Sequence, residues 1–249
     1  MISFVIPAYN EEHCLGAALE AIGAAARAVG RPFEIIVVDD ASTDRTGDVA
    51  RERGARVVRV ELRHIAAVRN AGARAAQGDL LFFVDADTIM PEAALRAALQ
   101  ALDEGAVGGG ARVKLEPGQN WTLRAATAAF AAFWFGMRWA AGCFIFVRRQ
   151  PFEAMGGFDE RYYIGEELYL SRALKRLGRF VILREPVVTS ARKLRLYGPW
   201  RLLRDSLRVL LGGSRAWRRH SGLEMWYEGR RDGRPPSGPQ GRPDRGRQG

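Results

Sequence analysis

Two carboxylates follow a hydrophobic segment near residue 80. Residues 80–84 read LLFFV, and Asp85 and Asp87 come directly after them, separated by Ala86. Alternate side chains of an extended chain point to the same side, so the two aspartates can converge on one ligand. Two hard oxygen ligands at an open position suit a divalent cation that keeps some water and a substrate phosphate. Because Asp-x-Asp triplets also occur in loops and at helix N-caps, the metal site depends on the surrounding residues.

Other polar residues stand at the ends of two earlier hydrophobic segments. The segment Ser3–Pro7 runs into AYNEE, and the segment Phe33–Asp39 runs into DASTD. A further acidic pair, Glu166 and Glu167, begins a helical pattern in the second half of the chain. If the hydrophobic segments are parallel strands, their carboxyl ends meet at one edge, which is where α/β sheets bind ligands.

The first half of the chain alternates the patterns of strands and helices. Strands are expected at Ser3–Pro7, Phe33–Asp39, Ala55–Val60 and Leu80–Val84, and helices at Glu11–Val29, Asp44–Arg53, Ala66–Ala76 and Met90–Glu104. Asp39 and Asp44 are then expected to serve a turn and a helix N-cap. This alternation predicts an α/β fold with a mostly parallel sheet covered by helices on both sides.

The second half of the chain is less regular. Strands are expected at Val107–Lys114, Gly142–Val147, Phe180–Leu183 and Val187–Thr189, and a helix at Glu166–Leu177 whose buried stripe is Leu170, Ala173, Leu174 and Leu177. The apolar segment Ala125–Met137 is shorter than the roughly 20 residues of a membrane span. We therefore expect a buried helix there, in preference to a segment that dips into a membrane.

The positive charge is unevenly distributed. The formal net charge is +10, and residues 229–249 hold six Arg and two Asp with almost no apolar residue. That composition predicts a disordered basic tail, and the rest of the chain still carries +6. Anionic partners are expected: phosphate-bearing substrates, an acidic membrane surface or nucleic acid. Residues Trp200–Arg219 are expected to form a basic amphipathic helix that docks on the domain or lies in an anionic membrane surface.

The cysteines and the N-terminus bear on the compartment. Cys14 and Cys143 form neither a metal-binding nor a disulfide pattern, which favours a reducing cytoplasm. The chain begins directly with a predicted strand, so no secretory signal is expected. We expect a cytoplasmic protein, or one attached to the inner face of the plasma membrane.

Five motifs occur in order along the chain. They are FVIPAYNEE, VVDDASTDRT, RNAGARAAQGD, FVDADT and GEELYLSRALKRLG. Over residues 1–195 this series resembles the family-2 glycosyltransferases. The resemblance implies a GT-A fold, a Rossmann-type mostly parallel sheet, and inverting transfer of a sugar from a UDP- or GDP-linked donor to an acceptor hydroxyl, for example in cell-envelope glycan synthesis. The predicted domains are the glycosyltransferase domain 1–198, a helical extension 199–228 and the tail 229–249.

The resemblance assigns several residues to the nucleotide. Pro7, Tyr9 and Glu11 would border the base and ribose, where a Tyr ring can stack on a base with about 1–3 kcal/mol. The alternative for Tyr9 is packing beneath a turn. Asp40 would accept the ring N–H of a uracil-type base. Arg69 would lie near the nucleotide, although a solvated helix face explains it equally well.

The resemblance also implies a divalent metal, Mg²⁺ or Mn²⁺, between the diphosphate and the Asp-x-Asp motif. Asp87 is expected to be the direct ligand, and Asp85 to bind the metal, the ribose or a metal-bound water. Arg192 and Lys193 would steady the departing diphosphate, with plain surface charge as the alternative. No third protein ligand is evident, and the histidines are expected to be structural or solvated (His13, His64 and His220).

The acidic pair would supply the catalytic base. The family commonly has Glu-Asp where this chain has Glu166-Glu167, so the choice of base is open, with Glu167 preferred and Glu166 second. Glu is also favoured in the first turn of a helix by the helix dipole. An ionised carboxylate there could take a proton from the acceptor hydroxyl as it attacks the anomeric carbon.

Two other classes of function are considered. A nucleotidyltransferase of related fold would show a Gly-rich phosphate loop after the first strand, where this chain has PAYNEE. A non-catalytic polyanion-binding protein finds support only in the tail and the net charge, and specific nucleic-acid binding is not expected. The Gln-x-x-Arg-Trp motif of processive family members is missing, so polymer synthesis is disfavoured. The acceptor is not predicted, although the aromatic residues between 121 and 135 suit a lipid-linked one.

Overall fold

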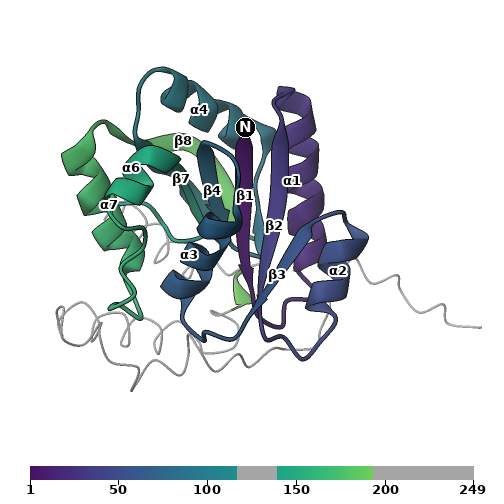
Figure 1. Cartoon of the computed structure of the whole chain (residues 1–249). Coiled ribbons are helices and arrows are strands. Elements are labelled where there is room, and N and C mark those ends of the chain that lie inside the picture. The colour runs from purple at the N-terminus through teal and green to yellow at the C-terminus, as the bar shows by residue number, and fades with distance from the viewer. Residues whose placement is uncertain (117–138, 193–249) are drawn as a thin grey trace, which may run out of the picture.

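The computed structural model describes residues 1–116 and 139–192 of the chain (Figure 1). The predicted helix Ala125–Met137, Lys193, the extension 199–228 and the tail 229–249 lie outside the described residues. Among the residues that are described, no helix is both long and apolar enough to cross a membrane.

The described residues form one eight-stranded sheet with the order β3-β2-β1-β4-β7-β6-β8-β5. The strands are β1 Ile2–Ala8, β2 Phe33–Asp40, β3 Arg56–Val60, β4 Leu80–Val84, β5 Thr88–Ile89, β6 Gly108–Leu115, β7 Phe144–Arg148 and β8 Phe180–Thr189. β1 is parallel to β2 and β4, β2 to β3, and β6 to β8, whereas β7 and β5 run antiparallel to their neighbours. The mostly parallel α/β sheet is therefore confirmed.

Helices cover both faces of this sheet (Figure 1). One face packs against α1 (Leu15–Val29), α2 (Thr46–Glu52) and α4 (Glu92–Asp103). The other packs against α3 (Ile65–Ala75), α6 (Arg149–Ala154) and α7 (Glu166–Leu177). The central strands are continuously apolar because each strand residue is buried on one face or the other.

Alternate side chains of each strand point to opposite faces of the sheet and so contribute to two different cores. In β4, Phe82 packs in the core beneath α1 and α4, whereas Leu81 and Phe83 pack in the core beneath α3, α6 and α7. Phe83 lies edge-on to Phe158, with their ring centroids 4.9 Å apart. Burying large aromatic residues on both faces fixes β4 firmly, so the residues that follow it have a rigid support.

Some predicted boundaries are wrong. Helix α1 begins at Leu15 rather than Glu11, because Asn10 has a left-handed backbone (φ 52°) and residues 11–14 form a turn closed by the Glu11 carbonyl. The two strands predicted around residue 185 are the single strand β8. Leu177, predicted to be buried, is 49% exposed because it ends α7 just before Gly178.

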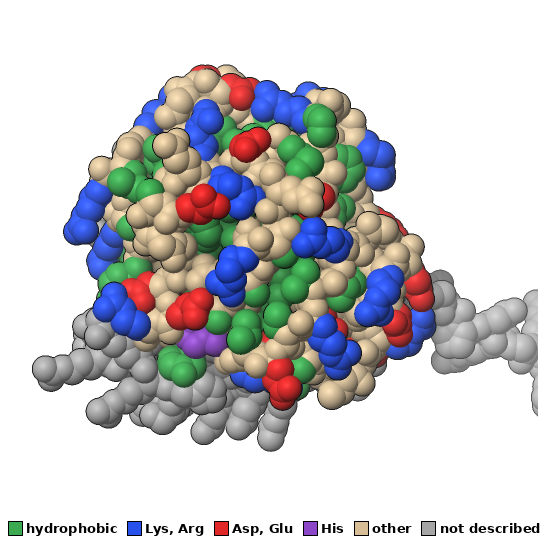
Figure 2. Space-filling model, in the orientation of Figure 1, with side chains coloured by type: hydrophobic (Ala, Val, Ile, Leu, Met, Phe, Trp, Pro, Cys, Tyr) green, Lys and Arg blue, Asp and Glu red, His purple; other side chains and the backbone are tan. Residues whose placement is uncertain are grey.

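The parallel strands β1, β2, β4 and β8 all end at one side of the sheet, which we call the carboxyl edge. Their last residues are Ala8, Asp40, Val84 and Thr189. The face of the molecule in Figure 2 shows basic and acidic side chains interspersed rather than one basic patch. That face therefore offers no single basic surface for a polyanion.

Candidate active site

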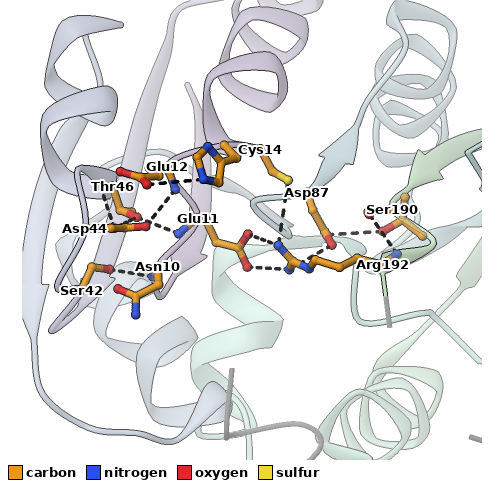
Figure 3. A network of polar contacts seen from close by, with 12 residues as sticks. Asn10, Glu11, Glu12, Cys14, Ser42, Asp44, Thr46, Asp87, Ser190 and Arg192 are labelled. Carbon is orange, nitrogen blue, oxygen red and sulfur yellow. Dashed lines mark hydrogen bonds and ion pairs between the residues drawn. The ribbon is translucent and has the colours of Figure 1, made fainter. Parts of the chain in front are cut away.

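Arg192 and two acidic residues meet at the carboxyl edge (Figure 3). Glu11 follows β1, Asp87 follows β4, and Arg192 follows β8. The Arg192 guanidinium forms a two-pronged ion pair with Glu11, with N–O distances of 2.8 and 2.9 Å. Its Nη2 also lies 3.6 Å from Asp87 Oδ2. The structure therefore brings together three predicted site residues that are far apart in the sequence.

A second ion-pair network joins the Asp-x-Asp segment to the acidic pair on α7. Arg69 Nη1 donates to Glu166 at 2.6 Å, and Arg69 Nη2 donates to Asp85 at 2.9 Å. Nη2 also donates to the Gly142 carbonyl at 2.8 Å. Arg69 is only 2% exposed, so a solvated helix face is wrong for this residue. It lies between the two acidic sites and binds both.

The charges around Arg69 determine its protonation. Burial alone would lower its pKa, but the neighbouring Asp85 and Glu166 carboxylates outweigh that effect and raise the pKa. Arg69 therefore remains a permanent cation inside the protein. Its ion pair with Glu166, which is 5% exposed, partly offsets the cost of burying both side chains.

Glu167 has a different environment from Glu166. Both belong to the first turn of α7, which follows Gly165 in the left-handed conformation (φ 77°). Burial raises the pKa of Glu167, and the negative charge of Glu166 raises it further. Two adjacent carboxylates with one guanidinium thus separate into an ion-paired Glu166 and a Glu167 that holds its proton more tightly.

Asp40 fixes the loop between β3 and α3. Asp40 Oδ1 accepts from the Leu62 backbone N–H at 2.7 Å, and Oδ2 accepts from that of Arg63 at 2.9 Å. This places the Arg63 guanidinium 3.9 Å from the centre of the Tyr9 ring. Arg63 was not predicted from the sequence, because it lies outside the five motifs and its partner is 54 residues away in the chain.

Asp39 serves a turn as predicted, but Asp44 is not the N-cap of α2, because that helix begins at Thr46 after Arg45. Asp39 Oδ1 accepts from the Ser42 backbone at 2.9 Å, and Asp44 Oδ1 accepts from the Thr46 backbone at 2.9 Å. Thr46 in turn receives the Glu11 backbone N–H at 2.7 Å on its hydroxyl. The turn after β2 therefore holds the segment after β1 in place.

Sequence reasoning assigned no active role to Asn70 of α3 or to His64, the N-cap of that helix. The Asn70 side chain accepts from the Phe158 N–H and donates to the Phe158 carbonyl, both at 2.9 Å, and donates to Glu160 at 2.8 Å. It holds the loop that leads to α7. His64 caps α3 by accepting from Ala67 N–H at 3.4 Å, which confirms its structural role.

The acidic residues suit a divalent cation that brings other ligands with it. No group of three or more His, Cys, Asp or Glu side chains is arranged to hold a metal within residues 1–116 and 139–192. Asp87 and Asp85, with side chains 19% and 34% exposed, offer hard oxygen atoms at the carboxyl edge. Mg²⁺ is commonly held by one or two carboxylates together with water and substrate phosphates. The donor set therefore fits such a cation.

Comparisons with known proteins show relatives of this chain. The chain is 37% identical over 113 residues to an undecaprenyl-phosphate 4-deoxy-4-formamido-L-arabinose transferase of Edwardsiella ictaluri, which covers 42% of this chain and 34% of the relative. The chain thus spans about a third of the length of that curated relative.

Solved structures confirm the GT-A fold. The mannosyltransferase PcManGT from Pyrobaculum calidifontis, in complex with GDP-Man and Mn²⁺, aligns with a TM-score of 0.67 and 21% identity over 91% of this chain and 67% of that one. Glucosyl-3-phosphoglycerate synthase from Mycobacterium tuberculosis, in complex with Mn²⁺, UDP and glucosyl-3-phosphoglycerate, aligns with a TM-score of 0.58 and 21% identity over 85% and 79% of the two chains. The model of glycosyl transferase family 2 matches residues 3–156, which is more than half of the chain. The protein therefore belongs to glycosyl transferase family 2.

Proposed function

We propose that the protein transfers a sugar from a nucleotide-diphospho-sugar to an acceptor by a metal-assisted, inverting single displacement, one sugar at a time. The observation that carries this proposal is the Arg69 network, which joins Asp85 to Glu166. This network supports the proposal because it connects Asp85, which would help to hold the metal and diphosphate, to the acidic pair that would accept the proton. Donor activation and acceptor activation need this proximity.

The nucleotide would lie along the ends of β1 and β2. Tyr9 offers an aromatic face for stacking and Asp40 a carboxylate, while the Arg63 guanidinium beside Tyr9 adds a second flat surface. Pro7 near the end of β1 and Glu11 after it lie on either side of Tyr9 in the sequence. UDP and GDP are the donor nucleotides to test first, because the named structural neighbours are bound to UDP or GDP-Man.

The diphosphate would lie near Asp87 and Arg192. A bound Mg²⁺ or Mn²⁺ held by Asp87, with Asp85 as second ligand, would neutralise charge on the departing nucleoside diphosphate. Arg192 presents a guanidinium that can bind phosphate oxygens in a forked geometry. Lys193 directly follows it in the sequence, outside the described residues, and is proposed as a second cation for the diphosphate.

The acceptor oxygen would attack the anomeric carbon from the side opposite the diphosphate. A bond forms between that oxygen and the anomeric carbon, the bond to the diphosphate oxygen breaks, and the configuration inverts. For a hydroxyl acceptor, the proton passes to Glu167 as general base, while Glu166 stays paired with Arg69. A raised pKa suits Glu167 for this role, because a base is most effective when its pKa is near the working pH.

A lipid phosphate is a second candidate acceptor. The Edwardsiella ictaluri relative is named for undecaprenyl phosphate. A phosphate oxygen is already ionised and needs no base, and a protonated Glu167 would not repel it. In that case the acceptor would be met at the cytoplasmic face of the membrane, with the protein attached peripherally.

Calorimetric titration tests the donor half of this proposal. UDP and GDP are titrated into the full chain with Mn²⁺ and again with chelator, and the same is done for Asp87→Asn. We expect one nucleotide to bind wild type only when Mn²⁺ is present. For Asp87→Asn, we expect the affinity for that nucleotide to be the same with Mn²⁺ as with chelator. Asp48→Asn, which removes an exposed carboxylate paired with Arg51, is the matched control and should bind as wild type. Equal binding in chelator would contradict the proposal.

Transfer by Glu167→Gln tests the acceptor half. With a hydroxyl acceptor the variant should bind donor normally and lose transfer by roughly 10²–10⁴-fold, the contribution of a general base. With a lipid phosphate acceptor it should retain most transfer. Full transfer to a hydroxyl acceptor would exclude Glu167 as the base, and the same assay on Glu166→Gln then tests its neighbour.

A further inference from the structure

The carboxylate best placed to hold the metal already has a positive partner. Arg192 Nη2 lies 3.6 Å from Asp87 Oδ2, and both side chains are mostly buried. The other oxygen, Asp87 Oδ1, accepts a hydrogen bond from Thr189 Oγ1 at 3.4 Å. Figure 3 shows the guanidinium lying between Glu11 and Asp87. A dication approaching Asp87 alone would meet this guanidinium.

Arg192 is held in this position from both ends. Its backbone N–H donates to Ser190 Oγ at 3.1 Å, and its side chain is clamped by Glu11 through two bonds. Glu11 is itself anchored by the bond from its backbone N–H to Thr46. A forked pair of this kind leaves the guanidinium little freedom to turn away from Asp87.

The local charges favour a cation and an anion arriving together. One guanidinium is shared by the Glu11 and Asp87 carboxylates. A metal ion alone is repelled by Arg192, and a diphosphate alone is repelled by the carboxylates. A metal–diphosphate pair removes both conflicts, because the metal takes Asp87 and the diphosphate oxygens take the freed donors of Arg192.

We propose that Arg192 is a resident counter-ion of Asp87, which makes divalent-cation binding conditional on a nucleoside diphosphate. This inference rests on the proposed function. Arg192 then acts twice, first as a barrier to the metal alone and then as a ligand of the diphosphate. The site would discriminate against free divalent cations, which carry no donor.

Electron paramagnetic resonance of Mn²⁺ tests this proposal with a readout other than activity. The full chain, Arg192→Gln and Arg192→Met are titrated with Mn²⁺ alone, and then with the nucleoside diphosphate selected by calorimetry. Removing the guanidinium should tighten binding of Mn²⁺ alone about tenfold, the effect of one unit charge at close range. The same variants should bind the diphosphate with Mn²⁺ about tenfold more weakly.

Arg179→Gln is the matched control. Arg179 also pairs with a carboxylate, Glu104 at 2.9 Å, but it precedes β8 and so lies at the opposite end of that strand. Its loss should change neither affinity by more than about twofold.

Two results separate this proposal from the function on which it rests. If wild type binds the diphosphate with Mn²⁺ and the Arg192 variants bind Mn²⁺ alone no more tightly than wild type, the counter-ion role is overturned. If wild type binds neither ligand, the proposed function itself fails. Should both variants fold poorly by circular dichroism, wild type alone decides, because equal affinity for Mn²⁺ with and without the diphosphate overturns the proposal.

Discussion

Arg69 joins two acidic sites that lie on separate segments of the chain. It is separated by 97 residues from Glu166 and by 16 from Asp85, yet it donates to both at 2.6 and 2.9 Å. Buried charges of this kind are kept only when they are paired, because an isolated charge in the interior is costly. At the scale of single residues, Arg69 therefore links Asp85 to Glu166, which belong to the two sites that the proposed function assigns to donor activation and proton transfer.

Replacing Arg69 should destabilise the fold, because the carboxylates that it pairs would remain without a counter-ion. Arg69→Met leaves Asp85 and the buried Glu166 without their counter-ion, so we expect the free energy of unfolding to fall by about 3–5 kcal/mol. Urea denaturation measures this loss. Arg96→Met, which removes an exposed pair with Glu92, is the control and should change stability by at most about 1 kcal/mol. Equal losses of unfolding free energy in the two variants would show that the buried network stabilises the fold no more than an exposed ion pair.

The raised pKa of Glu167 makes a prediction about stability and pH. The folded protein holds this proton more tightly than the unfolded chain, so the protonated group stabilises the fold at low pH. That stability is lost as the pH rises from the ordinary carboxylate range through the raised pKa. Wild type should therefore lose stability relative to Glu167→Gln with rising pH, by at most about 1.4 kcal/mol per pH unit.

Thermal or urea unfolding from pH 5 to 9 measures this difference. Glu153→Gln, at an exposed carboxylate on α6, serves as the control and should run parallel to wild type. A constant gap between wild type and Glu167→Gln across that range would mean that Glu167 titrates normally.

Residue-level prediction from sequence succeeded where a residue follows directly on a strongly apolar segment. Asp85 and Asp87 were placed correctly because β4 is short, apolar and followed at once by both carboxylates. The contacts of Arg69 and Asn70 could not be predicted, because Asn70 binds residues 88 and 90 positions away on a loop without periodicity. The pattern of neighbouring residues does not indicate hydrogen-bond partners that lie this far apart in the sequence.

Among the elements, α3 approaches the sheet closely at Gly72. Gly72 faces β1 and β2 so closely that a Cβ added there would lie 2.2 Å from Val5 Cγ1 and 2.7 Å from Val38 Cγ2. The close approach brings the α3 residues Arg69 and Asn70 to their partners. The position of this helix, rather than its mere presence, assembles the site.

Gly72→Ala should therefore destabilise the fold although Ala favours helices. Overpacking a core costs about 1–3 kcal/mol, more than the roughly 1 kcal/mol that Ala contributes to a helix. Gly23→Ala in α1 is the control, because its nearest neighbour is the flexible tip of Arg27 at 3.1 Å, and it should be neutral or stabilising. Chemical denaturation of both variants gives the comparison, and equal stability would contradict the close packing.

Most elements could be predicted, but their ends could not. Continuous apolar runs identified β1, β2 and β4, since parallel strands buried on both faces leave little room for polar residues. The predicted start of α1 was wrong because the backbone N–H groups of residues 10–12 donate to side chains of the segment after β2, including Thr46. These hydrogen bonds keep residues 10–12 out of the helix. Strand β8 was divided in two at Arg184, Glu185 and Pro186, yet it continues along β6.

On the scale of the whole molecule, we predict that the basic tail can be removed without loss of the candidate site. The site is built from residues between Tyr9 and Arg192, whereas residues 229–249 contribute +4 of the net charge. We predict that deleting residues 229–249 lowers the affinity for heparin strongly and leaves binding of Mn²⁺ with the nucleoside diphosphate within about twofold of wild type. Retention on a heparin column and calorimetry measure the two effects. Loss of both together would favour the polyanion-binding alternative.

The proposed function requires that a metal and a diphosphate meet at the ends of β1, β4 and β8. The most direct measurement is a crystal structure of the full chain grown with Mn²⁺ and the nucleoside diphosphate selected by calorimetry, with anomalous scattering recorded for manganese. We predict one manganese peak about 2.0–2.2 Å from an Asp87 carboxylate oxygen, the distance typical of a small hard dication, with the Arg192 guanidinium on the diphosphate. A manganese peak remote from Asp87, or a diphosphate bound away from the carboxyl edge, would contradict it.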